Sequence, residues 1–77
     1  MIMSRIDPQY AADICEMEKN IISGVQKKMN ARTSQIIGIL DVHNFYQDAY
    51  MFPELLLHES IENWIDEVIF DLEHNNF

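Results

Sequence analysis

The sequence lacks basic residues over its final 45 positions. All five Lys and Arg residues lie at or before Arg32, whereas nine of the thirteen acidic residues follow it. Residues 1–32 carry five bases against four acids, which gives +1, and residues 33–77 carry −9, so the formal charge is −8. Binding to nucleic acid or to an anionic membrane requires clustered Lys and Arg, and this composition argues against both.

Cysteine, glycine and proline are also scarce. A single cysteine, Cys15, excludes an intramolecular disulfide and a cysteine-based zinc cluster, and we expect a reducing, cytoplasmic location. With two Gly, two Pro and 48% hydrophobic residues, the composition is that of a folded domain. No apolar run approaches the roughly 18 residues that cross a bilayer, and residues 1–10 show no signal-peptide pattern, so we expect neither export nor membrane insertion.

The length and the missing motifs argue against catalysis. A chain of 77 residues allows one domain, 1–77, and buries only roughly 60% of its unfolded surface, which disfavours a deep pocket. The serines have no nucleophile-elbow context, no glycine-rich phosphate loop is present, and Cys15 has no histidine near it in sequence. We therefore predict a non-enzymatic protein that needs no cofactor.

Helical periodicity predicts a first helix over about 8–30. Asp7 and Pro8 make a favourable helix start, and Gly24 interrupts the apolar stripe, which weakens the helix by roughly 1 kcal/mol but can permit close approach of another helix. Apolar residues recur at steps of three and four on one face: Tyr10, Ile14, Met17, Ile21, Val25 and Met29.

A second helix is expected over about 34–50, after a break in which Thr33 or Ser34 acts as the N-cap. The β-branched run within 35–42 also suits a buried strand, but no second strand candidate exists to pair with it. A third helix is expected over about 53–74, where Pro53 suits the first turn and Leu57, Ile61, Trp64 and Val68 form an a/d-like face. The predicted fold is an all-α, small three-helix bundle completed by dimerisation.

The third predicted helix carries the strongest functional pattern, a series of acidic residues without any base between them. Such a one-signed surface either keeps the protein soluble or binds a basic partner. A nucleic-acid-binding protein is basic, so carboxylates in this position can mimic the phosphates that it normally holds. The predicted acidic face comprises Glu59, Glu62, Asp66, Glu67, Asp71 and Glu73.

Histidines accompany the acidic residues, which raises the question of a metal site. Glu54, His58 and Glu62 are spaced four residues apart, so one helical face offers three potential ligands. The Glu-x-x-His pairs from two helices that a di-metal bundle requires are absent, and we predict no metal.

Apolar residues crowd into positions 45–56, more than three short helices easily bury. Aromatic and methionine side chains left exposed there are typical of a partner or dimer interface, although a well-filled core at a tight corner is the alternative. The predicted anchors are Tyr46, Tyr50, Met51 and Phe52.

These features predict a protein-binding regulator or inhibitor, a homodimer whose partner is a basic, nucleic-acid-binding protein. In size and charge, without a shared motif, the chain is similar to the small acidic phage proteins that block restriction or CRISPR machinery, which implies a nucleic-acid-mimicking antagonist from a phage or mobile element. Two other classes remain open. One is an immunity protein, antitoxin or chaperone-like partner that neutralises a client, and the other is a small structural subunit of a larger complex.

Overall fold

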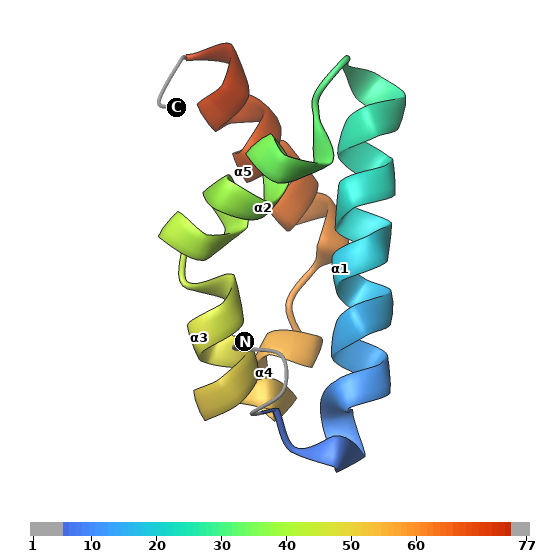
Figure 1. Cartoon of the computed structure of the whole chain (residues 1–77), viewed down its shortest axis with the longest axis vertical. Coiled ribbons are helices and arrows are strands. Elements are labelled where there is room, and N and C mark those ends of the chain that lie inside the picture. The colour runs from blue at the N-terminus through green and yellow to red at the C-terminus, as the bar shows by residue number, and fades with distance from the viewer. Residues whose placement is uncertain (1–5, 75–77) are drawn as a thin grey trace.

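The first helix, α1 (Pro8–Lys28), forms as the sequence predicts and ends two residues earlier than expected. The Asp7 carboxylate accepts a hydrogen bond from the Gln9 amide at 3.0 Å, which caps the helix, and Pro8 occupies the first turn. Lys27 and Lys28 occupy the last turn, where the helix dipole favours cations. In this computed structural model, which describes residues 6–74, α1 forms one long side of the molecule (Figure 1).

Four shorter helices form the rest of the described chain: α2 (Thr33–Val42), α3 (Phe45–Met51), α4 (Pro53–Leu57) and α5 (Ile61–Glu73). The all-α class is confirmed, and residues 6–74 contain no strand, so the run within 35–42 is helical. The predicted N-cap of α2 is wrong, because Arg32 occupies that position and its amide donates to the side chain of Gln35 at 3.0 Å. Thr33 begins the helix, and its hydroxyl accepts instead from the Gln26 amide group at 3.1 Å.

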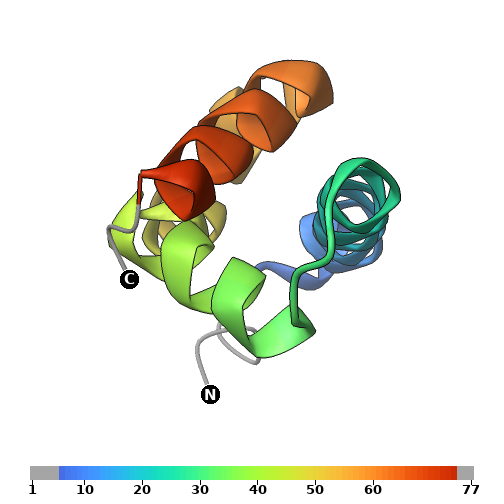
Figure 2. The ribbon, with the colours of Figure 1, turned by 90° about the horizontal axis from the view of Figure 1, so that it is seen from above.

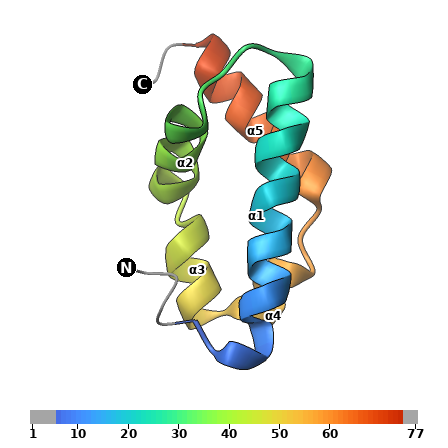
Figure 3. The ribbon, with the colours of Figure 1, turned by 45° about the vertical axis from the view of Figure 1, so that its right-hand side comes forward.

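The helix expected over 34–50 is interrupted at His43 and Asn44. Asn44 adopts a left-handed backbone conformation, with φ of 66°, and no other non-glycine residue among those described has a positive φ. Asparagine tolerates this region better than most residues, so it can end α2 and reorient the chain into α3. As a result, α2 and α3 lie one above the other on the side opposite α1 (Figure 3).

The helix expected over 53–74 is also two helices. The chain leaves α4 at His58 and restarts at Ser60, whose hydroxyl accepts from the Asn63 amide at 3.3 Å and caps α5. Seen from above, α5 and α1 lie on either side of α2 (Figure 2). The molecule measures 34 × 19 × 17 Å.

The core lies between α1 and the other four helices. Phe45 is fully buried and meets both Tyr46 and Trp64 edge to face, with ring centroids 5.2 Å apart in each pair. The approach of α1 to α5 depends on Gly24, as its small size predicts: a Cβ there would overlap Cδ1 of Ile65 and lie 3.0 Å from its Cγ1. Residues buried from α1 are Ile14, Met17, Ile21 and Val25, and those from α2 and α5 include Ile36, Ile39, Leu40, Ile65 and Val68.

Candidate partner-binding surface

Three of the predicted acidic residues share one flank of α5. Glu62, Asp66 and Glu73 are exposed and are separated by four and seven residues, so their side chains leave the helix in similar directions. The sequence places no base near Glu62, but the fold does, because Lys28 Nζ of α1 lies 3.6 Å from its Oε2. Both side chains are more than half exposed, and such a pair contributes at most about 1 kcal/mol.

The other three predicted acidic residues lie elsewhere, so the six do not form one face. Asp71 is only 14% exposed at its side chain, and its Oδ2 lies 2.5 Å from Nε2 of His43 at the end of α2. Glu59 precedes α5 and accepts a hydrogen bond from Trp64 Nε1 at 3.0 Å. Glu67 is exposed beside Trp64, away from the flank formed by Glu62, Asp66 and Glu73.

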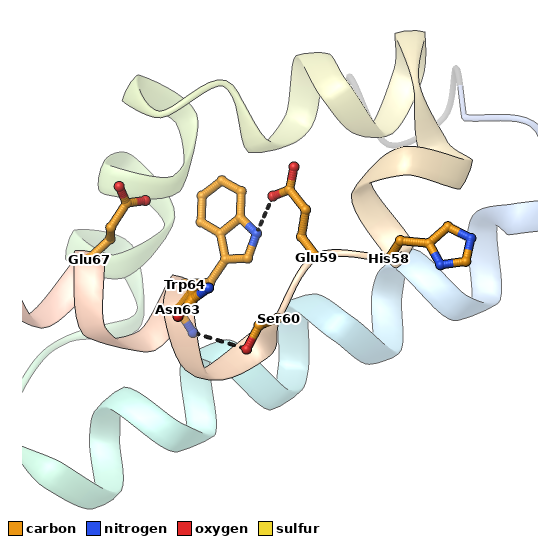
Figure 4. Close-up of a pocket in the computed structure, with 6 residues that line it drawn as sticks. All are labelled: His58, Glu59, Ser60, Asn63, Trp64 and Glu67. Carbon is orange, nitrogen blue, oxygen red and sulfur yellow. Dashed lines mark hydrogen bonds between the residues drawn. The ribbon is translucent and has the colours of Figure 1, made fainter.

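Glu59 and Glu67 border a surface hollow of about 450 Å³ (Figure 4). Figure 4 shows the Trp64 indole with Glu59 on one side and Glu67 on the other, while the His58 ring is directed away from the indole. The polar residues Ser60 and Asn63 complete the wall, and the Ser60 hydroxyl caps α5 by accepting from the backbone amide of Asn63. Trp64 is only 6% exposed, and the two acidic side chains that line this hollow are Glu59 and Glu67.

A second, smaller hollow of about 200 Å³ shares Glu59 and brings in two acidic residues of α1, Asp13 and Glu16. Its apolar lining is supplied by Met17, Leu57 and Ile61. The acids of residues 1–32 are balanced by bases in number, but Lys27 and Lys28 lie at the far end of α1. Sequence reasoning missed this grouping because it depends on the packing of α1 against α4 and the start of α5.

The apolar corner where α3 meets α4 exposes three of the four predicted anchors. Tyr50, Met51 and Phe52 have exposed fractions of 48%, 52% and 53%. The fourth prediction, Tyr46, is wrong, because it is 7% exposed and packs into the core. Leu55, which the prediction omitted, has the largest exposed fraction of the large apolar side chains described, 65%. An adjoining hollow of about 280 Å³ is lined by Tyr10, Met51, Phe52, Pro53, Glu54 and Leu55.

Tyr46 has a structural role that its position in the sequence does not reveal. Its hydroxyl donates a hydrogen bond to the carboxylate of Glu18 on α1. Burial raises the pKa of Tyr46 well above its usual value, and the hydrogen bond to Glu18 and the negative charges of Glu18 and Asp41 raise that pKa further. Tyr46 therefore remains neutral and links α3 to α1.

The described residues give little basis for other site types. Within residues 6–74, no three His, Cys, Asp or Glu side chains are grouped as metal ligands, and Cys15 is exposed with a free thiol. None of the described helices has the length and apolar character that crossing a membrane requires. The comparisons with known proteins found no matching family model, curated protein or solved structure.

Proposed function

We propose that this protein is a non-enzymatic regulator or inhibitor that binds a basic, nucleic-acid-binding protein in place of that partner's nucleic acid. The observation that supports this proposal is the exposed row formed by Glu62, Asp66 and Glu73 on α5. At 1.5 Å of rise per residue, these carboxylates repeat at about 6 and about 10 Å along the helix. A row of fixed negative charges on a rigid element presents to a basic groove the charge pattern that a phosphate backbone presents.

The distribution of cations supports the same proposal. Lys27 and Lys28 on α1 and Arg32 before α2 are grouped near the end of the first helix, and Lys28 contacts the acidic row only at Glu62. Asp66 and Glu73 lie further along α5, away from that contact. A partner with clustered Lys or Arg can therefore approach the later part of the row, and association should weaken as salt screens it.

The test is a displacement assay with the full chain. A basic nucleic-acid-binding protein is loaded with fluorescent double-stranded DNA, and the release of that DNA is followed by anisotropy at low and high salt. We expect displacement at low salt, a large loss of affinity at high salt, and at least about a tenfold loss on Asp66→Lys, which corresponds to about 1.4 kcal/mol. Asp41→Lys, an exposed reversal on α2 with the same change in net charge, should have a much smaller effect. Failure to displace DNA, or equal loss in both variants, would reject the proposal.

A chaperone-like or immunity-type function is the second candidate, and the exposed corner at Tyr50, Met51, Phe52 and Leu55 favours it. In that case Leu55→Ser should abolish binding of the client, whereas Asp66→Lys should change it little. The expectation that the chain forms a homodimer remains a prediction, and sedimentation at micromolar concentration tests it.

A further inference from the structure

Two hollows follow one another along the boundary between α1 and α4. The first is the apolar hollow between Tyr10 of α1 and Leu55 of α4, and the second is the acidic hollow that Asp13 and Leu57 help to line. Tyr10 and Asp13 are one turn apart on α1, Leu55 and Leu57 are two residues apart on α4, and these two helices pack together. The two hollows and their lining residues are called the α1–α4 surface below.

The first hollow can hold an apolar side chain. Its walls are apolar except for Glu54, and Met51, Phe52 and Leu55 are each more than half exposed around it. Leu56, next to Leu55 in the sequence, is buried in the core. The exposed side chains therefore point away from the core because of their positions around these short helices. Removing exposed apolar area of this kind from water favours association.

The second hollow adds charge of one sign. Asp13, Glu16 and Glu59 surround its apolar lining, and neither Lys nor Arg lines either hollow among the residues that the structure describes. Lys27 is fourteen residues beyond Asp13 on α1, about 21 Å along the axis, which exceeds the Debye length of about 8 Å at physiological salt. Lys19 is nearer along the helix but does not line the hollow. Among the described residues, no cation of α1 forms an ion pair with Asp13, Glu16 or Glu59.

We infer that the α1–α4 surface docks a basic protein segment that carries an apolar anchor. The anchor occupies the hollow between Tyr10 and Leu55, and Lys or Arg side chains next to it pair with Asp13, Glu16 and Glu59. A second copy of this chain is a poor occupant, because each copy carries a net charge of −8. The inference rests on the proposed function, since both require a basic partner, but it places the contact on a different surface from the row on α5.

Methyl NMR of the full chain, labelled at Met and Leu, tests this inference with three synthetic peptides of equal length. One is an amphipathic helix of Leu and Lys, the second replaces each Lys with Glu, and the third replaces each Leu with Ser. We expect the first peptide alone to shift the methyl signals of Met51 and Leu55 in a saturable manner. Met29, at the far end of α1, provides the internal control and should not respond.

Matched charge reversals locate the contact. Asp13→Lys with Glu16→Lys should weaken binding of the Leu/Lys peptide at least tenfold, whereas Glu62→Lys with Asp66→Lys, which changes net charge equally, should weaken it much less. Leu55→Ser, at a side chain too exposed to be needed for folding, should also remove the saturable shift. Dispersed methyl spectra of each variant verify that it is folded.

Several results would overturn the inference. Equal binding of the Lys and Glu peptides would show that charge does not select the occupant, and equal binding of the Ser peptide would show that no anchor is needed. Shifts of Met51 and Leu55 that grow with protein concentration alone would identify a second copy as the occupant. If Glu62→Lys with Asp66→Lys weakens binding of the Leu/Lys peptide more than Asp13→Lys with Glu16→Lys does, the α1–α4 surface is rejected. The proposed function then still stands, because the DNA displacement assay tests it separately.

Discussion

At the scale of single residues, Tyr46 and Tyr50 show how position decides the role of a side chain. They are four residues apart on α3, yet Tyr46 is buried beside Phe45 while Tyr50 is half exposed at the corner. Glu18 supplies an acceptor for the buried Tyr46 hydroxyl at the edge of the core. A buried hydroxyl without such a partner would cost about 1–3 kcal/mol.

This arrangement predicts a loss of stability in alkaline solution. A tyrosine in the unfolded chain ionises near pH 10, whereas the raised pKa of folded Tyr46 keeps its proton on to higher pH. The stabilisation is therefore complete below about pH 10 and is lost as the pH rises above it, at about 1.4 kcal/mol per pH unit. Urea unfolding from about pH 9 to about pH 11 should show that the parent protein loses about 1 kcal/mol more than Tyr46→Phe. Tyr50→Phe is the control, and equal slopes for Tyr46→Phe and the parent would contradict the assignment.

A second prediction concerns the contact between Gly24 and Ile65. Gly24→Ala gains roughly 1 kcal/mol of helix propensity, but overpacking of a filled contact costs about 1–3 kcal/mol, so we expect a net destabilisation of about 1 kcal/mol. Ile65→Val removes the Cδ1 atom that the new methyl group would meet. In a double-mutant cycle followed by urea unfolding, Gly24→Ala should be neutral or stabilising in the Ile65→Val background. Strict additivity of the two changes would show that the close approach has no energetic consequence.

At the scale of the helices, the short breaks direct the chain. Asn44 turns α3 away from the axis of α2, and the segment from His58 to Ser60 does the same between α4 and α5. With these changes of direction, Met51, Leu55 and Leu57 line hollows beside Tyr10 and Asp13 of α1.

The left-handed conformation of Asn44 therefore predicts a particular pattern of substitution. Asn44→Gly should leave the free energy of unfolding within a few tenths of a kcal/mol, because glycine adopts a positive φ without steric cost. Asn44→Ala should cost about 1–2 kcal/mol, since an alanine there places its Cβ against the following carbonyl. Asn30→Ala, at an exposed asparagine with negative φ between α1 and α2, is the control for loss of the side chain. Equal effects of alanine at both positions would mean that φ is not the cause.

The same elements show what the sequence can predict and what it cannot. The apolar stripes of α1 and α5 are periodic, and burial of Ile14, Ile21 and Val68 follows that period directly. The break at Asn44 leaves no gap in the hydrophobic pattern, because Phe45 and Tyr46 continue it. Helical spacing likewise places Tyr46 and Tyr50 on one side of α3, and it does not reveal that the acceptor for the Tyr46 hydroxyl is Glu18, 28 positions earlier.

The candidate site divides in the same way. The exposure of Met51 and Phe52 can be predicted because positions 45–56 hold more apolar residues than a small domain easily buries. The row of Glu62, Asp66 and Glu73 can be predicted from helical spacing. The meeting of Asp13 and Glu16 with Glu59 is different, because it joins residues more than forty positions apart in the sequence. No pattern within one helix predicts such a group, since it is produced by packing between helices.

At the scale of the whole molecule, the thirteen acidic residues outnumber the five bases by eight, and a charge of −8 is large for a protein with a radius of gyration of 11.9 Å. Three of the four bases in the described chain, Lys27, Lys28 and Arg32, are grouped around the end of α1, so the attraction they provide is local, as in the pair of Lys28 with Glu62. The rest of the surface repels itself, which lowers the stability of the folded state. Any partner that supplies cations should relieve this repulsion as it binds.

Salt should therefore stabilise the folded chain. Raising NaCl from about 0.01 M to about 1 M shortens the Debye length from about 30 Å to about 3 Å, so the repulsion between separate carboxylates on the molecule is screened. We expect a gain of about 1 kcal/mol, or about 4–8 °C in Tm for a domain of this size, measured by circular dichroism. Asp66→Asn with Glu73→Gln lowers the charge on α5 without touching the pair of Lys28 with Glu62, so this variant should have a higher Tm at low salt and a smaller response. If salt instead lowers the Tm, local ion pairs outweigh the repulsion, and the surface is not a source of stored electrostatic free energy for binding a basic partner.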